Sequence, residues 1–419
     1  MHQSLDDWLT YVSSLHPIAW DLTLDRVKQV AATLEVLRPA QTVILVAGTN
    51  GKGSCCEAIS MLAERAGLRV GLSTSPHLQK FNERIRIDGK MVSDDTIVRA
   101  FEGIERARAG VTLSYFEFSC LAALLIFKAA DLDVAVLEIG LGGRLDAMNI
   151  VDPDLTVILP IALDHQDYLG DNREDIGREK AGILRRGCPL VLADPEPPES
   201  ILVEAQRLGA PVLRINEAFY WRTEGVQWTD RSGTLRQCAE AHWPPALPKE
   251  SLAAALQVVS LKIDVDSESI GQLRNLALLG RMTKILVGDT PVYLDVAHNP
   301  HAAEHLARRL QALGVQSFRA VVGMYADKDA RAVLRALAPL VSGWYFAAVD
   351  ESRALAPDQL RLAMPDSAVG TSEIYSEIAA ALASALSDCP QSESIVVFGS
   401  FPVVGEALEY LAGQVQAGS

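Results

Sequence analysis

The stretch from residue 42 to residue 56, TVILVAGTNGKGSCC, constrains the fold of this chain more than any other. An apolar, β-branched run leads into a glycine-rich turn, and a segment compatible with a helix, 55–66, follows at once. A buried strand, a glycine loop and a helix N-terminus together form an anion site, because backbone N–H groups and the helix dipole favour phosphate oxygens. Lys52 adds a full positive charge. The order of these features predicts a P-loop that binds a nucleotide.

The loop departs from the usual pattern, G-x-x-x-x-G-K-[ST], at two positions. Val46 stands where the first glycine is usual, and Gly53 separates Lys52 from Ser54. The alternative interpretation is a glycine-rich turn that binds nothing, but the order strand, loop, lysine, helix favours nucleotide binding. The residues expected to surround the nucleotide phosphates are Thr49, Asn50, Gly51, Lys52, Gly53 and Ser54.

Composition places the chain among globular proteins, and its 419 residues are enough for two or three domains. The formal net charge of −15 argues against a surface that coats nucleic acid. The N-terminal segment, MHQSLDDWLT, is acidic and polar, unlike a signal peptide, and no apolar run approaches the length of a membrane span. We therefore expect no nucleic-acid partner and no membrane partner, and we expect a monomer.

The six cysteines show no spacing typical of a metal site or of a disulfide framework. Cys55 and Cys56 are adjacent and follow the phosphate loop, where packing is the better interpretation of their presence. This use of cysteine predicts a reducing compartment, and we expect the protein to be cytoplasmic.

Strand-like and helix-like segments alternate between residues 40 and 190. Such alternation predicts βαβ units and a parallel sheet with helices on both faces. From 212 to 237 the pattern changes to short runs broken at Glu224-Gly225 and Ser232-Gly233, which predicts antiparallel strands. The expected parallel strands are 42–47, 69–73, 134–139 and 155–159, and the expected antiparallel strands are 212–215, 218–223, 225–230 and 233–237.

The alternation restarts near Gly280 and continues towards the C-terminus. The predicted fold class is α/β, with a P-loop parallel-sheet ATPase domain over 1–280 that includes the small antiparallel β section. A smaller Rossmann-like α/β domain is expected over 281–419, which is large enough to fold separately. Its expected strands are 292–296, 319–322, 343–347 and 394–398, with a helix over 302–313.

Polar residues follow the ends of three expected strands in the first domain. Ser75 follows the second strand, Glu138 lies at the end of the third, and His165 follows the fourth. Ligands bind at the carboxyl ends of strands in open parallel sheets, so neighbouring strands would bring these residues together beside the phosphates. A hydroxyl and a carboxylate near a triphosphate suit Mg²⁺, although imidazole is an uncommon ligand of this ion.

Several of these residues also have a purely structural interpretation. Ser75 alone is equally explained as the cap of a turn before Pro76, and His165 as a histidine with satisfied hydrogen bonds. Glu138 is harder to explain in this way, because a buried carboxylate without a partner is costly. Lys180, in the expected helix EDIGREKAGIL, reads locally as a solvated lysine among glutamate and arginine residues.

The second domain also places polar residues at a strand end. Asp295 and His298 follow the expected strand 292–296, and Asn299-Pro300 provides an N-cap and N1 pair for the next helix. Taken alone, His298 is equally explained as part of that turn, and Arg281 as a surface arginine. In the first domain, LEIGLGGRLDAMN lacks the G-x-G-x-x-G spacing, so we do not expect a dinucleotide site.

Taken together, nine segments resemble the bacterial folylpolyglutamate synthase/dihydrofolate synthase family, a branch of the Mur-type ATP-dependent amide ligases, over nearly the whole chain. The matching segments are HPIAWDLTLDRV, VAGTNGKGS, STSPHL, YFEF, LEIGLGGRLDAMNIV, IALDHQDYLG, GREKAGI, LDVAHNPHAA and FGSF. The resemblance implies that ATP phosphorylates a carboxylate of a pterin-containing substrate, and that the amine of L-glutamate attacks the acyl phosphate. The implied substrates are ATP, L-glutamate, dihydropteroate and tetrahydrofolates.

The resemblance also implies roles for single residues. Two Mg²⁺ ions are implied, with Ser75, Glu138 and His165 as ligands. Lys180 matches a lysine that is carbamylated in this family, and a carbamate would turn this cation into an anion able to bind Mg²⁺. The implied catalytic residues are Lys52, Lys180 and His298; the implied ATP contacts outside the loop are Ser251, Arg281 and Asp295; and the implied pterin-site residues are Trp20, Asp21, Phe116 and Asp146.

Two positions depart from the pattern of the family. Ser251 stands where asparagine is usual, and Trp20 stands where a smaller apolar residue is common. The alternatives are a folylpolyglutamate synthase with one activity or another Mur-type ligase, and the pair Gly53-Ser54 with the segment YFEF favours the folate branch. A P-loop switch or motor, the alternative from another class, would not need a second Rossmann-like domain with aspartate and histidine residues.

Overall fold

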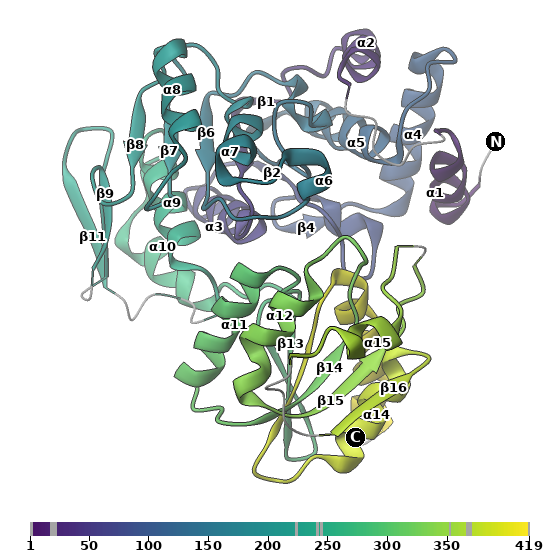
Figure 1. Ribbon diagram of the computed structural model, residues 1–419. Helices are drawn as coiled ribbons and strands as arrows, with labels where there is room; N and C mark the ends of the chain where they lie inside the picture. The colour runs from purple at the N-terminus through teal and green to yellow at the C-terminus, as the bar shows by residue number, and fades with distance from the viewer. Residues whose placement is uncertain are drawn as a thin grey trace. The chain divides into compact units, whose positions relative to one another are not determined.

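The computed structural model describes residues 3–16, 23–222, 225–239, 243, 246–351, 353–365 and 371–417. The chain forms two compact units, Met1–Leu276 and Ala277–Ser419, which are drawn from purple to green and from green to yellow in Figure 1. The division therefore falls a few residues before the boundary expected from the sequence.

The first unit contains an eight-stranded sheet in the order β4-β3-β2-β5-β1-β6-β7-β8. The strands from β2 to β8 in this order pair in parallel, whereas β3 and β4 are antiparallel additions at one edge. The predicted parallel sheet is confirmed. The strands are β1 (Ala40–Ala47), β2 (Val70–Ser73), β3 (Ile85–Ile87), β4 (Lys90–Met91), β5 (Leu132–Glu138), β6 (Leu155–Ile158), β7 (Leu190–Leu192) and β8 (Val212–Arg214).

Helices pack on both faces of this sheet because its central strands are apolar on both sides. Val43, Leu45 and Ala47 of β1 belong to one hydrophobic cluster with residues of α5, and the alternation of side chains turns Ile44 and Val46 to the other face. Helix α3 packs against β1, β2 and β5. The helices are α1 (Leu5–Ser14), α2 (Asp25–Leu34), α3 (Lys52–Arg65), α4 (Asp94–Arg108), α5 (Tyr115–Ala130), α6 (Gln166–Leu169), α7 (Arg173–Ala181), α8 (Glu199–Leu208), α9 (Lys249–Ser260) and α10 (Ser267–Gly271), with the 3₁₀ turns η1 (Phe81–Arg84), η2 (Ala147–Ile150) and η4 (Gln272–Asn275).

One strand of the predicted antiparallel section belongs to the main sheet. The segment 212–215 was expected among the antiparallel strands, but β8 pairs in parallel with β7 at the edge of the large sheet. The other three runs form a separate antiparallel sheet, β9 (Phe219–Arg222), β10 (Gly225–Thr229) and β11 (Leu235–Ala239), in the order β11-β10-β9. A three-residue strand carries too little alternation to reveal its partner, so the tertiary pairing with β7 decides.

The second unit contains a six-stranded sheet in the order β12-β13-β17-β14-β15-β16. Only β12 is antiparallel to its neighbour. The four expected strands are confirmed, and the edge strands β12 and β16 were not predicted. The elements are β12 (Thr283–Val287), β13 (Thr290–Asp295), β14 (Phe318–Val322), β15 (Val341–Ala347), β16 (Thr371–Tyr375), β17 (Ser394–Phe398), α11 (Pro300–Ala312), α12 (Ala330–Leu337), η5 (Ala338–Leu340), α13 (Pro357–Leu362), α14 (Ile378–Asp388) and α15 (Phe401–Ala417).

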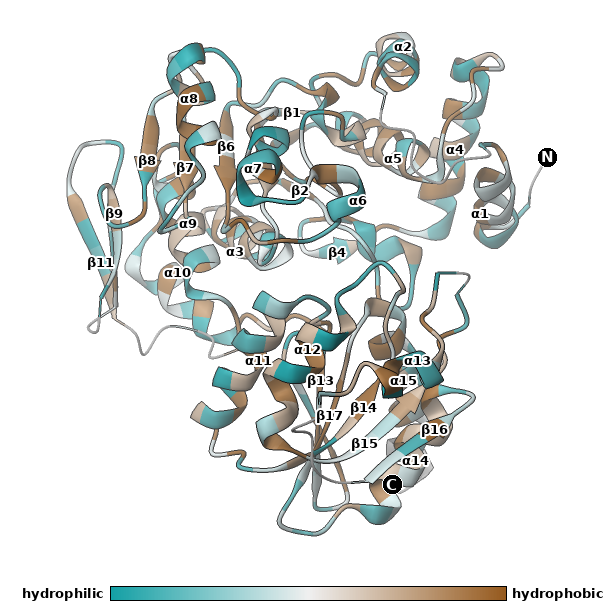
Figure 2. Cartoon of the chain, viewed as in Figure 1, coloured by the Kyte–Doolittle hydropathy of each residue, from teal (hydrophilic) through white to brown (hydrophobic). Residues whose placement is uncertain are grey.

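Figure 2 shows how hydropathy follows this architecture, with brown strands inside each unit and teal on helices such as α6 and α7. In the described part of the chain, no helix combines the length and the apolar character that a membrane span requires. Helix α7 is thus hydrophilic in sequence, although its last turn reaches the interior of the first unit, as described below.

Candidate active site

The sheet order places the carboxyl ends of β2, β5, β1 and β6 next to one another. Strand pairing sets their relative heights, because Ser73 is level with Leu137, Val46 with Glu138, and Ala47 with Ile158. The segments that follow these four strands therefore meet at one edge, as expected if the strands were neighbours. This edge contains the glycine loop.

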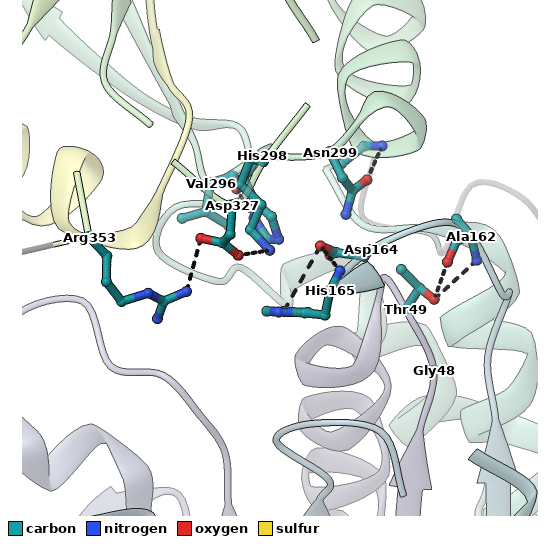
Figure 3. A network of polar contacts seen from close by, with 12 residues as sticks. Gly48, Thr49, Ala162, Asp164, His165, Val296, His298, Asn299, Asp327 and Arg353 are labelled. Carbon is teal, nitrogen blue, oxygen red and sulfur yellow. Dashed lines mark hydrogen bonds and ion pairs between the residues drawn. The ribbon is translucent and has the colours of Figure 1, made fainter. Parts of the chain in front are cut away.

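The glycine loop is closely packed and bonded to the segment after β6. Gly51 has a φ of 84°, a conformation that favours glycine, and α3 begins at the next residue, Lys52. The N–H of Thr49 donates to Pro160 O at 3.1 Å. Its hydroxyl donates to Ala162 O at 3.1 Å and accepts from Ala162 N at 3.0 Å (Figure 3). Thr49 thus fixes the loop from its side chain as well as from its backbone.

Two buried serine hydroxyls beside the loop have no hydrogen-bond partner among the described residues. They belong to Ser54, which is fully buried, and to Ser251, which is 1% exposed. Ser251 Oγ would lie 2.2 Å from a Cβ atom placed on Gly51, so α9 presses this hydroxyl against the loop. A buried hydroxyl without a partner is costly, and a polar ligand in the loop would remove that cost. The loop therefore fits a phosphate-bearing ligand.

Glu138 lies at the end of β5, next to the loop. The carboxylate is buried, with 6% of the residue exposed, and its Oε2 accepts from the N–H of Ser75 at 3.1 Å. A Cβ atom on Gly53 would lie 3.8 Å from the same Oε2, so the carboxylate faces the start of α3. Carboxylate and hydroxyl oxygens are the ligands that hard divalent cations prefer. Glu138 and Ser75 therefore fit a metal ion shared with nucleotide phosphates.

His165 has a φ of 51° and lies at the N-cap of α6. Its N–H donates to Asp164 Oδ1 at 2.9 Å, and its Nε2 lies 4.0 Å from the same oxygen. Figure 3 shows this pair beside the segment that bonds to Thr49. In the described part of the chain, no group of three or more histidine, cysteine, aspartate or glutamate side chains is arranged to hold a metal. The expected metal ligands are Glu138 and His165 together with Ser75, so oxygens of a nucleotide would have to complete the coordination.

An ion pair that the sequence did not predict holds the segment between β6 and His165. Arg173 Nη2 lies 2.9 Å from Asp194 Oδ2, and that oxygen accepts from Ile161 N at 2.8 Å. Arg173 Nε donates to Ile161 O at 2.9 Å. Both backbone groups of Ile161 are therefore bound by this pair. Nothing in the local sequence signals it, because Arg173 and Asp194 are far apart along the chain.

Lys180 is not a solvated lysine, which corrects the interpretation from its local sequence. Only 4% of Lys180 is exposed, and its Nζ donates to Gly48 O in the phosphate loop at 2.9 Å. Helix α7 approaches closely because Gly143 has no side chain: a Cβ atom there would lie 2.9 Å from Lys180 Cα. Burial, and secondly the charge of Lys52, lowers the pKa of Lys180 to about 7. A large share of the neutral amine therefore exists near neutral pH.

Lys52 also donates to the loop itself. Its Nζ lies 3.2 Å from Gly48 O and 3.2 Å from Thr49 O. Two amines, those of Lys52 and Lys180, thus share the carbonyl of Gly48. Their mutual repulsion explains why the charge of Lys52 disfavours the protonated form of Lys180.

Asp146 and Phe116 lie in the segment after β5 and on α5. Asp146 is 3% exposed, and its carboxylate accepts from Leu141 N and from Met148 N, both at 2.8 Å. Burial raises its pKa to about 6. A Cβ atom on Gly140 would lie 2.4 Å from Phe116 Cζ, so the ring covers this glycine. The expected pterin-site residues Trp20 and Asp21 lie outside the described residues.

The glycines of LEIGLGGRLDAMN do not lead into a dinucleotide-binding helix. Asp146 instead caps the short 3₁₀ turn η2. The structure therefore agrees with the interpretation that this segment is not a dinucleotide fingerprint.

In the second unit, Asp295 lies at the end of β13. It is 6% exposed, and its carboxylate accepts from Met282 N at 2.9 Å and from Ala297 N at 3.0 Å. Burial raises its pKa, against the opposing effect of the Arg281 and Arg309 charges. The guanidinium of Arg281 lies over the ring of Phe401, with its Cζ 5.3 Å from the ring centroid.

The turn after Asp295 forms as predicted. Asn299 accepts from Ala302 N at 2.9 Å and caps α11, with Pro300 in the first turn. His298 Nδ1 lies 2.9 Å from Val296 O, and Figure 3 shows this contact beside Asn299. The imidazole is therefore held by the backbone of the same turn.

Comparisons with known proteins cover nearly the whole chain. Residues 280–401 match the family model for the Mur ligase glutamate ligase domain. Dihydrofolate synthase/folylpolyglutamate synthase of Escherichia coli K12 is 39% identical over 418 residues, which span 99% of this chain and 97% of that protein. The Haemophilus influenzae protein of the same name is 38% identical, with 96% of each chain covered.

Solved structures are similar over the same length. The structure of E. coli FolC in complex with DHPP and ADP has a TM-score of 0.91 at 38% identity and covers 99% of both chains. The bifunctional folylpolyglutamate synthase/dihydrofolate synthase of Yersinia pestis CO92, complexed with AMPPNP and Mn ion, has a TM-score of 0.90 at 40% identity, with 98% of both chains covered. A further bifunctional synthase structure contains Mn, AMPPNP and L-glutamate, with a TM-score of 0.90 at 39% identity over 98% of both chains.

Lys180→Met is expected to change how stability depends on pH. The Lys180 pKa is about 7 in the folded chain, against an ordinary value of 10.5, so between these values only the unfolded chain binds the proton. Stability of the parent therefore rises with pH across this window, by about 1.4 kcal/mol for each pH unit. Urea unfolding in CO₂-free buffer should show the parent gaining roughly 2 kcal/mol on the variant between about pH 7.5 and pH 9.

Lys90→Met, at an exposed position on β4, is the matched control and should keep the pH dependence of the parent. A difference between Lys180→Met and the parent that stays constant with pH would contradict the assignment of a depressed pKa to Lys180.

Proposed function

This chain belongs to the dihydrofolate synthase/folylpolyglutamate synthase family of Mur-type ligases, and on that premise we propose how its own residues carry out the reaction. The enzyme is an ATP-dependent acid–amino-acid ligase that adds L-glutamate to dihydropteroate, forming dihydrofolate, and to reduced folates, extending their glutamate tails. The observation that carries this function is the extent of the match. It includes the phosphate loop, the edge with Glu138, and the glutamate ligase domain in one chain.

The reaction proceeds in two steps. A carboxylate oxygen of the pterin-containing substrate attacks the γ-phosphorus of ATP, and ADP leaves. The amine of L-glutamate then attacks the carbon of the acyl phosphate, phosphate leaves, and the amine loses its proton. ATP is the co-substrate and a divalent metal ion is the cofactor. When bound, the metal neutralises phosphate charge.

We assign the nucleotide contacts of the first unit to the glycine loop. The N–H groups at the start of α3 face the phosphates, and Lys52 adds a positive charge at the same end of the helix. The unpartnered hydroxyls of Ser54 and Ser251 are placed to donate to the nucleotide. The side chains that would hold the metal are those of Ser75, Glu138 and His165. Two metal ions are expected. Thr49 and Asn50 complete the loop, with the Thr49 side chain holding the segment after β6.

The remaining site residues are assigned by family resemblance together with their burial. Phe116 and Asp146 are proposed for the pterin end, and Trp20 and Asp21 are proposed from sequence alone. In the second unit, Arg281 and Asp295 are proposed as ATP contacts. His298, held by the backbone of its own turn, is proposed as a catalytic residue whose part in the reaction is to be assigned by experiment.

A cytoplasmic location and a monomeric state are also proposed. All six cysteines are free thiols, and five of them are buried, which is in keeping with a reducing compartment. The small molecules bound in the relatives' structures include ADP, AMPPNP and L-glutamate, which supports small-molecule partners for this chain as well.

The proposed function predicts ADP release with two acceptors. With ATP, Mg²⁺ and L-glutamate, the purified protein should release ADP with dihydropteroate and also with tetrahydrofolate, and omission of glutamate should prevent amide formation. Lys52→Ala should lower both rates by roughly 10²–10³, because it removes a charge positioned at the phosphates. Release with tetrahydrofolate alone would identify a folylpolyglutamate synthase with one activity, and release with neither acceptor would contradict the proposal.

Glu138→Gln should raise the concentration of Mg²⁺ needed for half-maximal activity by roughly tenfold or more, because the amide keeps the shape and loses the charge that holds a metal. Direct titration of Mn²⁺ by electron paramagnetic resonance, with the ATP analogue bound, measures the same loss without turnover. Glu35→Gln is the matched control, since its side chain is 84% exposed on the surface. Equal metal titrations for Glu138→Gln and the parent would make Glu138 a structural residue.

We further propose that Lys180 is carbamylated. The neutral amine attacks the carbon of CO₂ and releases a proton, and the buried position with a pKa lowered to about 7 supplies that neutral amine. Protein equilibrated with ¹³C-labelled CO₂ should show a carbamate resonance that Lys180→Met lacks. Short carboxylic acids should restore part of the activity lost in Lys180→Ala. The same resonance in Lys180→Met would place the carbamate elsewhere.

A further inference from the structure

Arg84 is a cation at the candidate site that has no ion-pair partner among the described residues. It lies at the end of η1, in the segment that joins β2 to β3. Among the residues that the structure describes, none forms an ion pair with Arg84, and its one side-chain hydrogen bond runs from Nε to His77 Nδ1 at 2.7 Å. The terminal nitrogens of the guanidinium therefore have no acceptor in the described part of the chain.

The partner His77 does not neutralise this cation. Burial, and secondly the charge of Arg84, lowers the pKa of His77 to about 4, so the imidazole is neutral and only accepts the hydrogen bond. Burial also lowers the pKa of Arg84, but a guanidinium stays charged at neutral pH. A partly buried charge without an ion pair is costly, and the fold retains it here.

Two aromatic rings hold the guanidinium in place. Its Cζ lies 5.7 Å from the ring centroid of Phe81 and 5.6 Å from that of Tyr115. Aromatic faces attract a guanidinium and orient its plane, but they leave its N–H edge free to bind another group. Arg84 is only partly buried, so a ligand can reach that edge.

Arg84 also lies beside residues already assigned to the site. Its carbonyl accepts from Thr74 N at 3.2 Å, directly before Ser75, and the charge of Glu138 acts on its guanidinium. Tyr115 precedes Phe116 on α5, the helix that supplies a proposed pterin-site residue. The cation is thus linked to the segment that carries Ser75 and, through the ring of Tyr115, to the helix that carries Phe116.

Arg86, two residues further along the chain in β3, shows what a structural arginine looks like nearby. It forms an ion pair with Glu57 of α3, so its charge is balanced within the chain, although its buried Nε has no hydrogen-bond partner among the described residues. Arg84 has the opposite arrangement, with aromatic neighbours and an unpaired charge. The contrast indicates that an anionic ligand from outside the chain forms the ion pair with Arg84.

We propose that Arg84 binds the reacting carboxylate of the pterin-containing substrate, with Phe81 and Tyr115 orienting its guanidinium. This inference rests on the proposed function. A guanidinium presents two parallel N–H donors that match a carboxylate, and the same donors match the oxygens of the acyl phosphate that forms from it. Arg84 thereby holds the oxygen that attacks ATP and stays bound to the same group after phosphoryl transfer.

The test compares two ligands in each protein at equilibrium and without ATP. Dihydropteroate and its carboxamide analogue are titrated by fluorescence into the parent, Arg84→Gln, Arg84→Lys and Arg99→Gln. The parent should bind the carboxylate roughly tenfold or more tightly than the carboxamide, since charge-assisted hydrogen bonds are lost with the amide. Arg84→Gln should bind both ligands with similar affinity, and Arg84→Lys should fall between, because an ammonium keeps the charge but loses the paired donors.

Arg99→Gln, on the outer side of α4, is the matched control and should keep the ratio of the parent. The ratio of the two affinities is taken within each protein, so a variant that is partly unfolded still reports it. If Arg84→Gln fails to fold, Arg84→Lys provides the test. A parent-like ratio in Arg84→Gln, or in Arg84→Lys alone, would overturn the proposal. A raised KM for L-glutamate in Arg84→Gln, with an unchanged ratio of carboxylate to carboxamide affinity, would also overturn it. Arg84 would then bind the amino acid and not the pterin-containing substrate.

The proposed function fails by a different result. If the parent releases no ADP with either pterin acceptor, the function is wrong whatever the variants bind. If the parent is an active ligase and the carboxylate ratio does not depend on Arg84, only the inference on Arg84 is wrong.

Discussion

The parallel pairing of β1 with β5 on one side and β6 on the other is the constraint on which the rest of the first unit depends. It sets Val46 level with Glu138 and Ala47 level with Ile158, and so decides which loops meet at the edge of the sheet. A shift of one residue in either pairing would turn alternate side chains to the wrong face. The buried apolar residues of β1 make such a shift expensive, because helices cover both faces.

Close approach at glycine positions converts this sheet edge into a dense polar site. Gly143 lets α7 bring Lys180 to the loop, and Gly51 lets α9 bring Ser251 to it. As a result, the amines of Lys52 and Lys180 donate to one carbonyl, that of Gly48. This crowding, with the exclusion of water, gives Lys180 a pKa far below that of a surface lysine. The reactivity proposed for Lys180 is thus a consequence of packing.

Local charge and total charge have opposite signs in this protein. The chain carries a formal net charge of −15, yet Lys52 and Arg84 lie at the edge where an anionic substrate is proposed to bind. Interactions between nearby charges in a partly dry site exceed those with distant surface charges, which salt screens. An acidic protein can therefore hold a nucleotide and a carboxylate through a few partly buried cations. Arg84 is the strongest indication of such anion binding, because no described residue forms an ion pair with it.

The sequence by itself determined the strands that carry the site, the glycine loop before α3, and the cap at Asn299-Pro300, because these depend on neighbouring residues. The resemblance of its segments also indicated the family and the reaction. Tertiary structure alone decided that β8 joins the main sheet, that Lys180 is buried, and that Arg173 and Asp194 hold Ile161. It also decided that no described residue forms an ion pair with Arg84. Each depends on contacts between segments far apart along the chain, and local propensity and charge pattern carry no record of such contacts.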